Sequence, residues 1–233
     1  MKRSKNAGFT LIELAIVLVV IGLIIAAVLK GEDLIQNARM LNFVTNPVQK
    51  AQVGAMAYYD RTGQFPVGTS TTTGPLYQMY QAGINGVLDL KNPFTQGSDS
   101  LGMALGTISV TDSNDNVGNY PVIVIQPVTV PAGGGTPTPT SWTQSELGYA
   151  NYLKSRIDGS TSSWTTGSVR MLKASITINY TALSSEITPT PTTSTYDGYF
   201  TPGTYSINDF ETPPPAGTSN TDTLVYFYNQ QPH

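Results

Sequence analysis

Cysteine is absent from this chain of 233 residues, which excludes a disulfide framework and a metal site built on thiolates. Histidine occurs once, as the last residue, His233, where chain ends are usually poorly ordered. The sequence also contains neither a glycine-rich phosphate loop nor a nucleophile elbow. These absences remove most familiar catalytic and zinc sites, so we expect no enzymatic activity and no catalytic residue.

Charge is scarce as well. Only 12 % of the residues are charged, and 12 basic against 15 acidic groups give a formal net charge of −3. The broad basic surface by which proteins bind nucleic acid is therefore missing, and no nucleic-acid partner is predicted. Glycine, proline, serine and threonine are abundant instead, a composition that favours a loop-rich β domain. The length suits one globular domain with an appendage.

One long apolar run stands at the N-terminal end. Residues 9–29 read FTLIELAIVLVVIGLIIAAVL and carry a single charge, Glu13. As a helix this run spans roughly 30 Å, the thickness of the hydrocarbon core of a bilayer. Lys2, Arg3 and Lys5 precede it, so the positive-inside rule places the N-terminus in the cytoplasm. Because the run is too long for a secretory signal and lacks a small-residue cleavage site after it, we predict a membrane-spanning helix.

Glu13 is the residue that a plain membrane anchor does not explain. A carboxylate on a membrane helix costs about 2.5–3.5 kcal/mol on insertion scales, so such a residue usually has a partner or a function. Glu13 is therefore predicted to have a partner or a function of its own.

Residues 5–13, KNAGFTLIE, resemble the prepilin peptidase recognition site of the type IV pilins and type II secretion pseudopilins. The resemblance implies that the peptidase cuts after Gly8, that residues 1–8 are a leader peptide, and that Phe9 becomes an N-methylated N-terminus. It also implies that Glu13 is the assembly carboxylate, which pairs with the Phe9 amine of a neighbouring subunit. The partners would be further copies of the chain in a filament, the peptidase and an inner-membrane assembly platform. The chain departs from many pilins in having Lys30-Gly31 where a proline is common, so Gly22 and Gly31 are the predicted points of bending.

Three functions remain open at this point. A type IV pilus subunit would wait in the bacterial inner membrane and then join an extracellular filament. A secretion pseudopilin would stay in the periplasm. An adhesive or ligand-binding module on a plain membrane anchor would require Glu13 to be incidental. The large, Thr/Pro-rich C-terminal part favours the pilus subunit, whose role is structural.

An amphipathic stem helix is predicted over residues 30–66, after the filament-core helix at 9–29. Its apolar residues recur with a seven-residue spacing in two adjoining rows, Leu34, Leu41, Val48 and Ala55, and Ala38, Val44, Ala51 and Tyr58. We expect this stripe to pack on a sheet of the same subunit. Pro47 should kink the helix without ending it, and residues 61–66, RTGQFP, should close it.

Residues 67–233 are predicted to form a β-rich head, which makes the fold class α+β, with the long N-terminal helix packed on an antiparallel sheet. Strands are expected at 107–111, 120–130, 168–180 and 223–228. Thr143 and Glu146 form a capping-box pattern that predicts a short helix near 144–158. The segments 154–159 and 166–170 also resemble a helix-loop-strand ending of some small pilin-like proteins.

Sites other than the N-terminal one are weakly supported by the sequence. Asp112, Asn114 and Asn116 offer oxygen atoms at alternating positions, as calcium loops do, and calcium is the one cofactor considered. The glycine falls one position late for an EF-hand and no matching glutamate follows, so an Asx-rich turn between two strands is favoured. Acidic residues such as Asp197 and Asp209 are interpreted as solvated turn residues.

Overall fold

A computed structural model of the full chain describes residues 10–68, 74–131, 136–174, 176–183, 195–211, 213, 222–229 and 232. The chain forms two compact units, Met1–Arg39 and Met40–His233. The first contains most of the long N-terminal helix, and the second contains the end of that helix together with all strands of the described residues.

The N-terminal helical run continues through Pro47, as predicted. It consists of α1 (Leu11–Phe43), a π-helical segment (Val44–Gln49) and α2 (Lys50–Thr62). Proline removes one backbone donor and crowds the preceding turn, and the wider π-helical turn accommodates both effects. Gly63, with φ of 75°, ends α2 in the left-handed conformation that glycine adopts most easily.

The predicted apolar stripe packs on the sheet only in its second half. Val44, Val48, Ala51 and Ala55 are fully buried. In contrast, Leu34 is 71 % exposed and Leu41 is 43 % exposed, so the prediction that they pack within the subunit is wrong. Periodicity identifies an apolar face but does not say whether that face contacts the same chain or another one.

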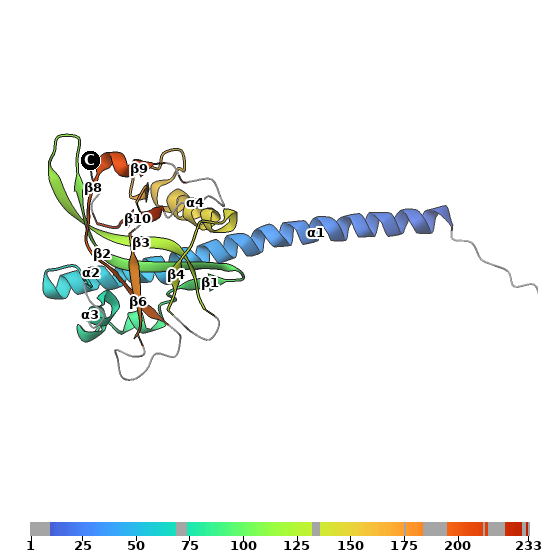
Figure 1. The fold of residues 1–233 in the computed structure, drawn as a ribbon. Helices are drawn as coiled ribbons and strands as arrows, with labels where there is room; N and C mark the ends of the chain where they lie inside the picture. Colours follow the sequence, from blue (N-terminus) through green and yellow to red (C-terminus); the bar gives the residue numbers. More distant parts are fainter. Residues whose placement is uncertain are drawn as a thin grey trace, which may run out of the picture. The chain divides into compact units, whose positions relative to one another are not determined.

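An antiparallel sheet forms the centre of the second unit (Figure 1). Its strands follow the spatial order β1-β2-β3-β10-β5-β9, with β4 beside β3 and β8 parallel to β2. The strands are β1 (Phe94–Gln96), β2 (Asp99–Thr111), β3 (Val117–Thr129), β4 (Thr138–Pro139), β5 (Val169–Leu172), β8 (Thr204–Ser206), β9 (Phe210–Glu211) and β10 (Thr223–Phe227). The α+β fold with a long N-terminal helix and an antiparallel sheet is therefore confirmed.

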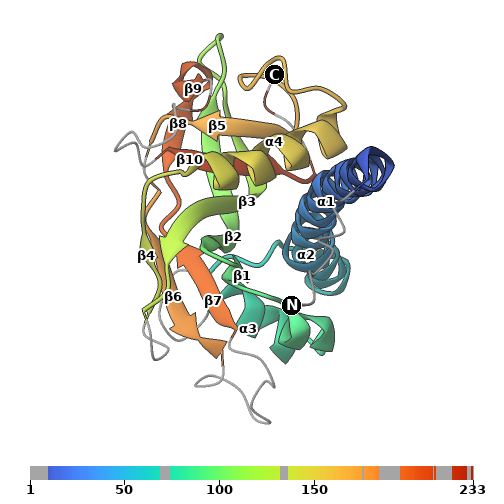
Figure 2. The ribbon, with the colours of Figure 1, turned by 90° about the vertical axis from the view of Figure 1, so that its right-hand side faces the viewer.

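The two faces of this sheet are buried by different elements. One face packs on α2, on α3 (Pro75–Gln81) and on α4 (Gln144–Asp158), and Figure 2 shows α2 and α4 on the same side of the sheet. The opposite face packs on a separate hairpin of β6 (Ile178–Ala182) and β7 (Tyr196–Phe200). Alternation along β3 explains the division, because Ile123 and Ile125 point to the helices while Val122 and Val124 point to the hairpin.

Glycine lets the hairpin approach the main sheet closely. A Cβ atom at Gly198 on β7 would lie 2.1 Å from the carbonyl oxygen of Met103 on β2. A Cβ atom at Gly106 would lie 2.7 Å from the ring of Phe200. Any side chain at either position would push the two layers apart.

Helix α4 begins with the capping box that the sequence predicted. The Glu146 amide donates to the Thr143 hydroxyl at 3.1 Å, and the Thr143 amide donates to the Glu146 carboxylate at 2.9 Å. Gly159, with φ of 74°, ends the helix. Two short helical segments complete the fold, Asn85–Asp89 and Ile207–Asp209.

The single strand predicted at 168–180 is wrong, because two strands in different sheets occupy this segment. β5 ends at Leu172, and the chain then leaves the main sheet and enters β6 at Ile178. Thr223 of β10 holds the crossing, since its hydroxyl donates to the Ala174 carbonyl at 3.0 Å and accepts from the Ile176 amide at 3.3 Å. Because Thr223 is far from this segment in the sequence, no local pattern indicates that the strand ends at Leu172.

A chain that begins at Met40 should fold as a soluble monomer. Phe43 is the first buried residue of the helical run, and its ring packs edge-on against Phe94 and Tyr149, with centroids 5.4 and 5.5 Å apart. The truncation therefore keeps the whole helix–sheet core and removes exposed apolar surface. Circular dichroism and size-exclusion chromatography would test this. A control that begins at Gln64 lacks the buried face of α2 and should be unfolded; an unfolded Met40 chain would contradict the prediction.

Candidate functional site

The apolar part of α1 lies in the first unit and is exposed along its whole length. Every described residue from Thr10 to Lys30 is exposed, including Leu11, which is 90 % exposed. Among the described residues, the run Leu11–Thr62 is the one helix long and apolar enough to cross a membrane, with a mean hydropathy of 3.1 in its most apolar window. Such a surface requires lipid or other apolar helices around it.

Glu13 lies in the first turn of this helix and helps to cap its N-terminal end. The Thr10 amide and the Thr10 hydroxyl both donate to Oε2 of Glu13, each at 2.8 Å. The Glu13 amide lies 3.4 Å from the Thr10 hydroxyl oxygen, to which it donates. This reciprocal arrangement is a capping box, and it satisfies backbone donors that the start of a helix leaves unpaired.

Thr10 is a residue of this candidate site that the sequence analysis did not single out. Its pattern, Thr-x-x-Glu before an apolar run, is the same one that predicted the start of α4. The isolated charge of Glu13 predicts a partner, and Thr10 supplies one within the same chain. The other two predicted site residues, Gly8 and Phe9, lie outside the described residues, so their roles in processing and assembly stay predictions.

The predicted calcium candidate forms a tight turn between β2 and β3. The Asp112 carboxylate accepts from the amides of Asn114 and Asn116, at 2.7 and 2.9 Å, and from the Asn116 side chain at 3.1 Å. These bonds, with that of the Asn116 side chain the largest contributor, hold the pKa of Asp112 below its usual value. The Asx-rich turn is thus confirmed. Across the described residues, no three Asp, Glu, His or Cys side chains converge on a common point. Calcium binding, which the sequence did not favour, stays untested.

Asp197 is not a solvated turn residue, contrary to the sequence interpretation. It is fully buried on β7. Its carboxylate accepts from the amides of Leu76 and Tyr77, at 3.0 and 2.9 Å, and so binds the N-terminal end of α3. Asp209 also has a structural role, because it accepts from the Ser206 amide at 2.7 Å.

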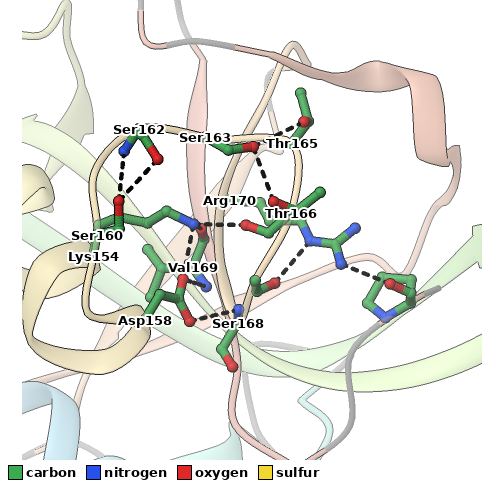
Figure 3. Close-up of polar contacts among 12 residues, drawn as sticks. Lys154, Asp158, Ser160, Ser162, Ser163, Thr165, Thr166, Ser168, Val169 and Arg170 are labelled. Carbon is green, nitrogen blue, oxygen red and sulfur yellow. Dashed lines mark hydrogen bonds and ion pairs between the residues drawn. The ribbon is translucent and has the colours of Figure 1, made fainter.

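A buried lysine joins the end of α4 to the start of β5 (Figure 3). Lys154 is 2 % exposed, and its Nζ lies 2.8 Å from Oδ2 of Asp158, 2.6 Å from the Thr166 carbonyl and 2.7 Å from the Val169 carbonyl. All three ammonium hydrogens thus have acceptors. The Trp164 ring lies against the same ammonium, with its centroid 5.8 Å away.

Asp158 completes this cluster by accepting hydrogen bonds from the residues that follow the loop. It accepts from the amides of Ser168 and Val169 at 2.8 and 3.0 Å, as well as from Lys154. Burial raises the pKa of Asp158, but the hydrogen bonds from Lys154 and the two amides outweigh it and leave the pKa lowered. The cluster holds the ends of the 159–167 loop together, which gives it a structural role and leaves the N-terminal segment as the candidate functional site.

In comparisons with known proteins, the match to a family model falls on that N-terminal segment. Residues 3–29 match the family model described as the prokaryotic N-terminal methylation motif. No curated protein and no solved structure matches the chain. The matched residues include the predicted cleavage position, the predicted new N-terminus and Glu13. The resemblance found in the sequence is confirmed: this chain carries, over residues 3–29, the N-terminal methylation motif of prepilin-type proteins, and the motif supports a type IV pilin-like or pseudopilin protein.

Proposed function

We propose that the chain is a structural subunit of a type IV pilus-like filament that polymerises through α1. The observation that carries the proposal is the exposed apolar helix with one carboxylate, Glu13, inside the matched motif. A plain anchor needs an apolar surface but no carboxylate. Before assembly the helix would lie in the inner membrane; after assembly, neighbouring α1 helices would replace the lipid around it.

Glu13 has a different partner in each of these two states. In the single chain it accepts hydrogen bonds from Thr10. Cleavage after Gly8 would turn the amide nitrogen of Phe9 into an amine, which is cationic at neutral pH. In a filament, Glu13 of one subunit would pair with that amine on its neighbour. The pairing would fix the axial register of the subunits, as one polar residue does in a coiled coil.

Processing at Gly8 gives a direct test of the first step. A bulky residue such as Phe or Leu at position 8 should leave the leader attached, because the peptidase needs close access to the backbone there. Mass spectrometry of wild-type protein should find N-methylated Phe9 as the first residue. An intact Met1 on assembled wild-type protein would contradict the proposal.

Electron microscopy of material sheared from cells would test the filament itself. Filaments outside the cell that contain this chain support a pilus subunit, which the Thr/Pro-rich head favours. Chain that is processed but stays in the periplasm would identify a secretion pseudopilin instead.

A further inference from the structure

The short helical segment Asn85–Asp89 begins with the one Asn-Gly pair of the sequence, Asn85-Gly86. Such a pair is chemically unstable in water. The backbone nitrogen that follows an asparagine can attack the carbon of the side-chain amide, and a glycine carries no side chain to crowd that nitrogen. The same arrangement of atoms occurs in two Asp-Gly pairs, Asp158-Gly159 and Asp197-Gly198. The fold decides which of these pairs can react.

Both Asp-Gly pairs are held in place by hydrogen bonds. The Gly159 amide donates to the Ser155 carbonyl at 3.0 Å, so the nitrogen after Asp158 is already occupied. Asp197 is fully buried, and its carboxylate accepts hydrogen bonds from two amides of α3. Neither pair can react without breaking buried or helical hydrogen bonds, which is costly in free energy.

The pair Asn85-Gly86 has none of these restraints. Both residues are exposed, and a Cβ atom built on Gly86 would meet no atom within 4 Å. Gly86 is the second residue of its segment, and the first amides of a helix find no acceptor inside it. In the part of the chain that the structure describes, no other group accepts a hydrogen bond from the Gly86 amide. The attacking nitrogen and the carbon that it attacks are therefore both accessible.

Reaction requires the start of the segment to open, because helical dihedral angles hold an asparagine side chain away from the next amide. The segment has only five residues in 3-10 geometry, whose hydrogen bonds are poor, so its first turn opens at little cost in free energy. Val87 and Leu90 are buried and anchor the rest of the segment while Asn85 moves.

We infer that Asn85 is a site of spontaneous modification, which converts the asparagine to aspartate and isoaspartate. The Gly86 nitrogen bonds to Cγ of Asn85, and the side-chain nitrogen takes up the proton that Gly86 loses and leaves as ammonia. Water then opens the cyclic imide at either of its two carbonyl carbons. In total, one water is consumed and one ammonia is released, and the reaction needs no enzyme and no oxidant.

The modification changes one face of the second unit. Both products carry a carboxylate, which is ionised at neutral pH, beside a groove that Gly86 and Asp89 line together with Lys50. Isoaspartate also lengthens the backbone by one carbon just before Val87, which packs against Gly54 of α2. An aged chain therefore differs from a new one in the charge and in the packing of this face.

Incubation of the full chain in detergent micelles, in a mildly alkaline buffer made with heavy-oxygen water, tests the inference. Trypsin cleavage after Arg61 and Lys91 releases a peptide in which Asn85 is the one asparagine. Mass spectrometry should find this peptide converted to the acid with one heavy oxygen, in two chromatographic forms, at a rate that rises in proportion to hydroxide. Asn114 and Asn208, which are exposed but precede an aspartate, should stay amides over the same time.

Gly86→Ala is the matched control, because the added methyl group has room in the fold and crowds only the attacking nitrogen. It should slow the conversion about tenfold. Wild-type chain unfolded in urea should convert at a rate within about tenfold of the folded one, since opening one turn costs little. An Asn85 that stays intact in the folded chain while the urea-treated chain converts would overturn the inference. So would a Gly86→Ala chain that reacts as fast as wild type. Since no filament is needed, the result does not depend on the proposed function.

Discussion

Glu13→Gln should abolish filaments while mature subunit accumulates in the membrane. Glutamine also serves in a capping box, so the contact with Thr10 and the first turn of α1 should persist. What is lost is the negative charge that, in the proposed filament, would compensate the buried amine of a neighbour. Breaking a buried ion pair costs about 3–5 kcal/mol, and here the loss recurs at every subunit joint. Sheared filaments and a membrane-fraction blot, each compared with wild type, would measure the two outcomes.

Two further variants separate the charge of Glu13 from its local hydrogen bonds. Asp33→Asn removes an exposed acid from the same helix beyond the apolar run, and it should leave the filament yield unchanged. Glu13→Ala removes both the charge and the contact with Thr10. A normal filament yield from Glu13→Gln would show that the carboxylate serves only the helix start, and the plain-anchor function would regain support.

Asp158→Ala should be the most destabilising of the predicted changes in the second unit. It leaves the Lys154 ammonium buried without its anion and the Ser168 and Val169 amides without their acceptor. Removing one partner of a buried pair costs about 3–5 kcal/mol, a large part of the stability of a domain. Urea unfolding of the Met40 chain would measure the change. Glu211→Ala, which breaks the exposed pair with Lys173 at 3.2 Å, should cost under about 1 kcal/mol and is the matched control.

The stabilising effect of Asp158 should depend on pH. Its pKa is lower in the folded chain than in the unfolded one, so the unfolded chain takes up the proton first as the pH falls. The contribution is therefore complete above the unfolded value, about 3.9, and is lost as the pH falls through the folded value. The difference in stability between wild type and Asp158→Ala should shrink in acid. A difference that is constant from neutral pH into acid would contradict the assigned role of the carboxylate.

The parts of this molecule that the sequence predicted are those fixed by neighbouring residues. A charge inside an apolar run, a Thr-x-x-Glu pattern and a glycine at a helix end are all local, and they gave Glu13 and the bounds of α4. The strand at 168–180 was mispredicted because the break depends on Thr223, from another strand. Asp197 was misinterpreted for the same reason, since its partners Leu76 and Tyr77 lie far back in the chain.

The sequence predicted the carboxylate of the candidate site and the apolar helix that carries it. It predicted only part of how the rest of that helix is packed. The apolar run and Glu13 indicated a membrane helix whose carboxylate has a partner or a function. The resemblance to prepilin-type proteins, which the matched motif supports, implied that the partner is a neighbouring subunit. The exposure of Leu34 and Leu41 was not foreseen, because a helical stripe looks the same whether its partner is a sheet of the same chain or a second subunit. Only the packing of the head on the later residues, such as Val48 and Ala55, distinguishes the two.

The loop after α4 is closed by an ion pair and hydrogen bonds where many secreted domains use a covalent cross-link. Closing it requires no oxidant and no disulfide isomerase, so the cluster of Lys154 and Asp158 can form as soon as the chain around it collapses. Reducing agents have no bond to break in a chain without cysteine. The head should therefore reach the same fold in reducing and oxidising surroundings, and assembly into the proposed filament would not depend on thiol chemistry.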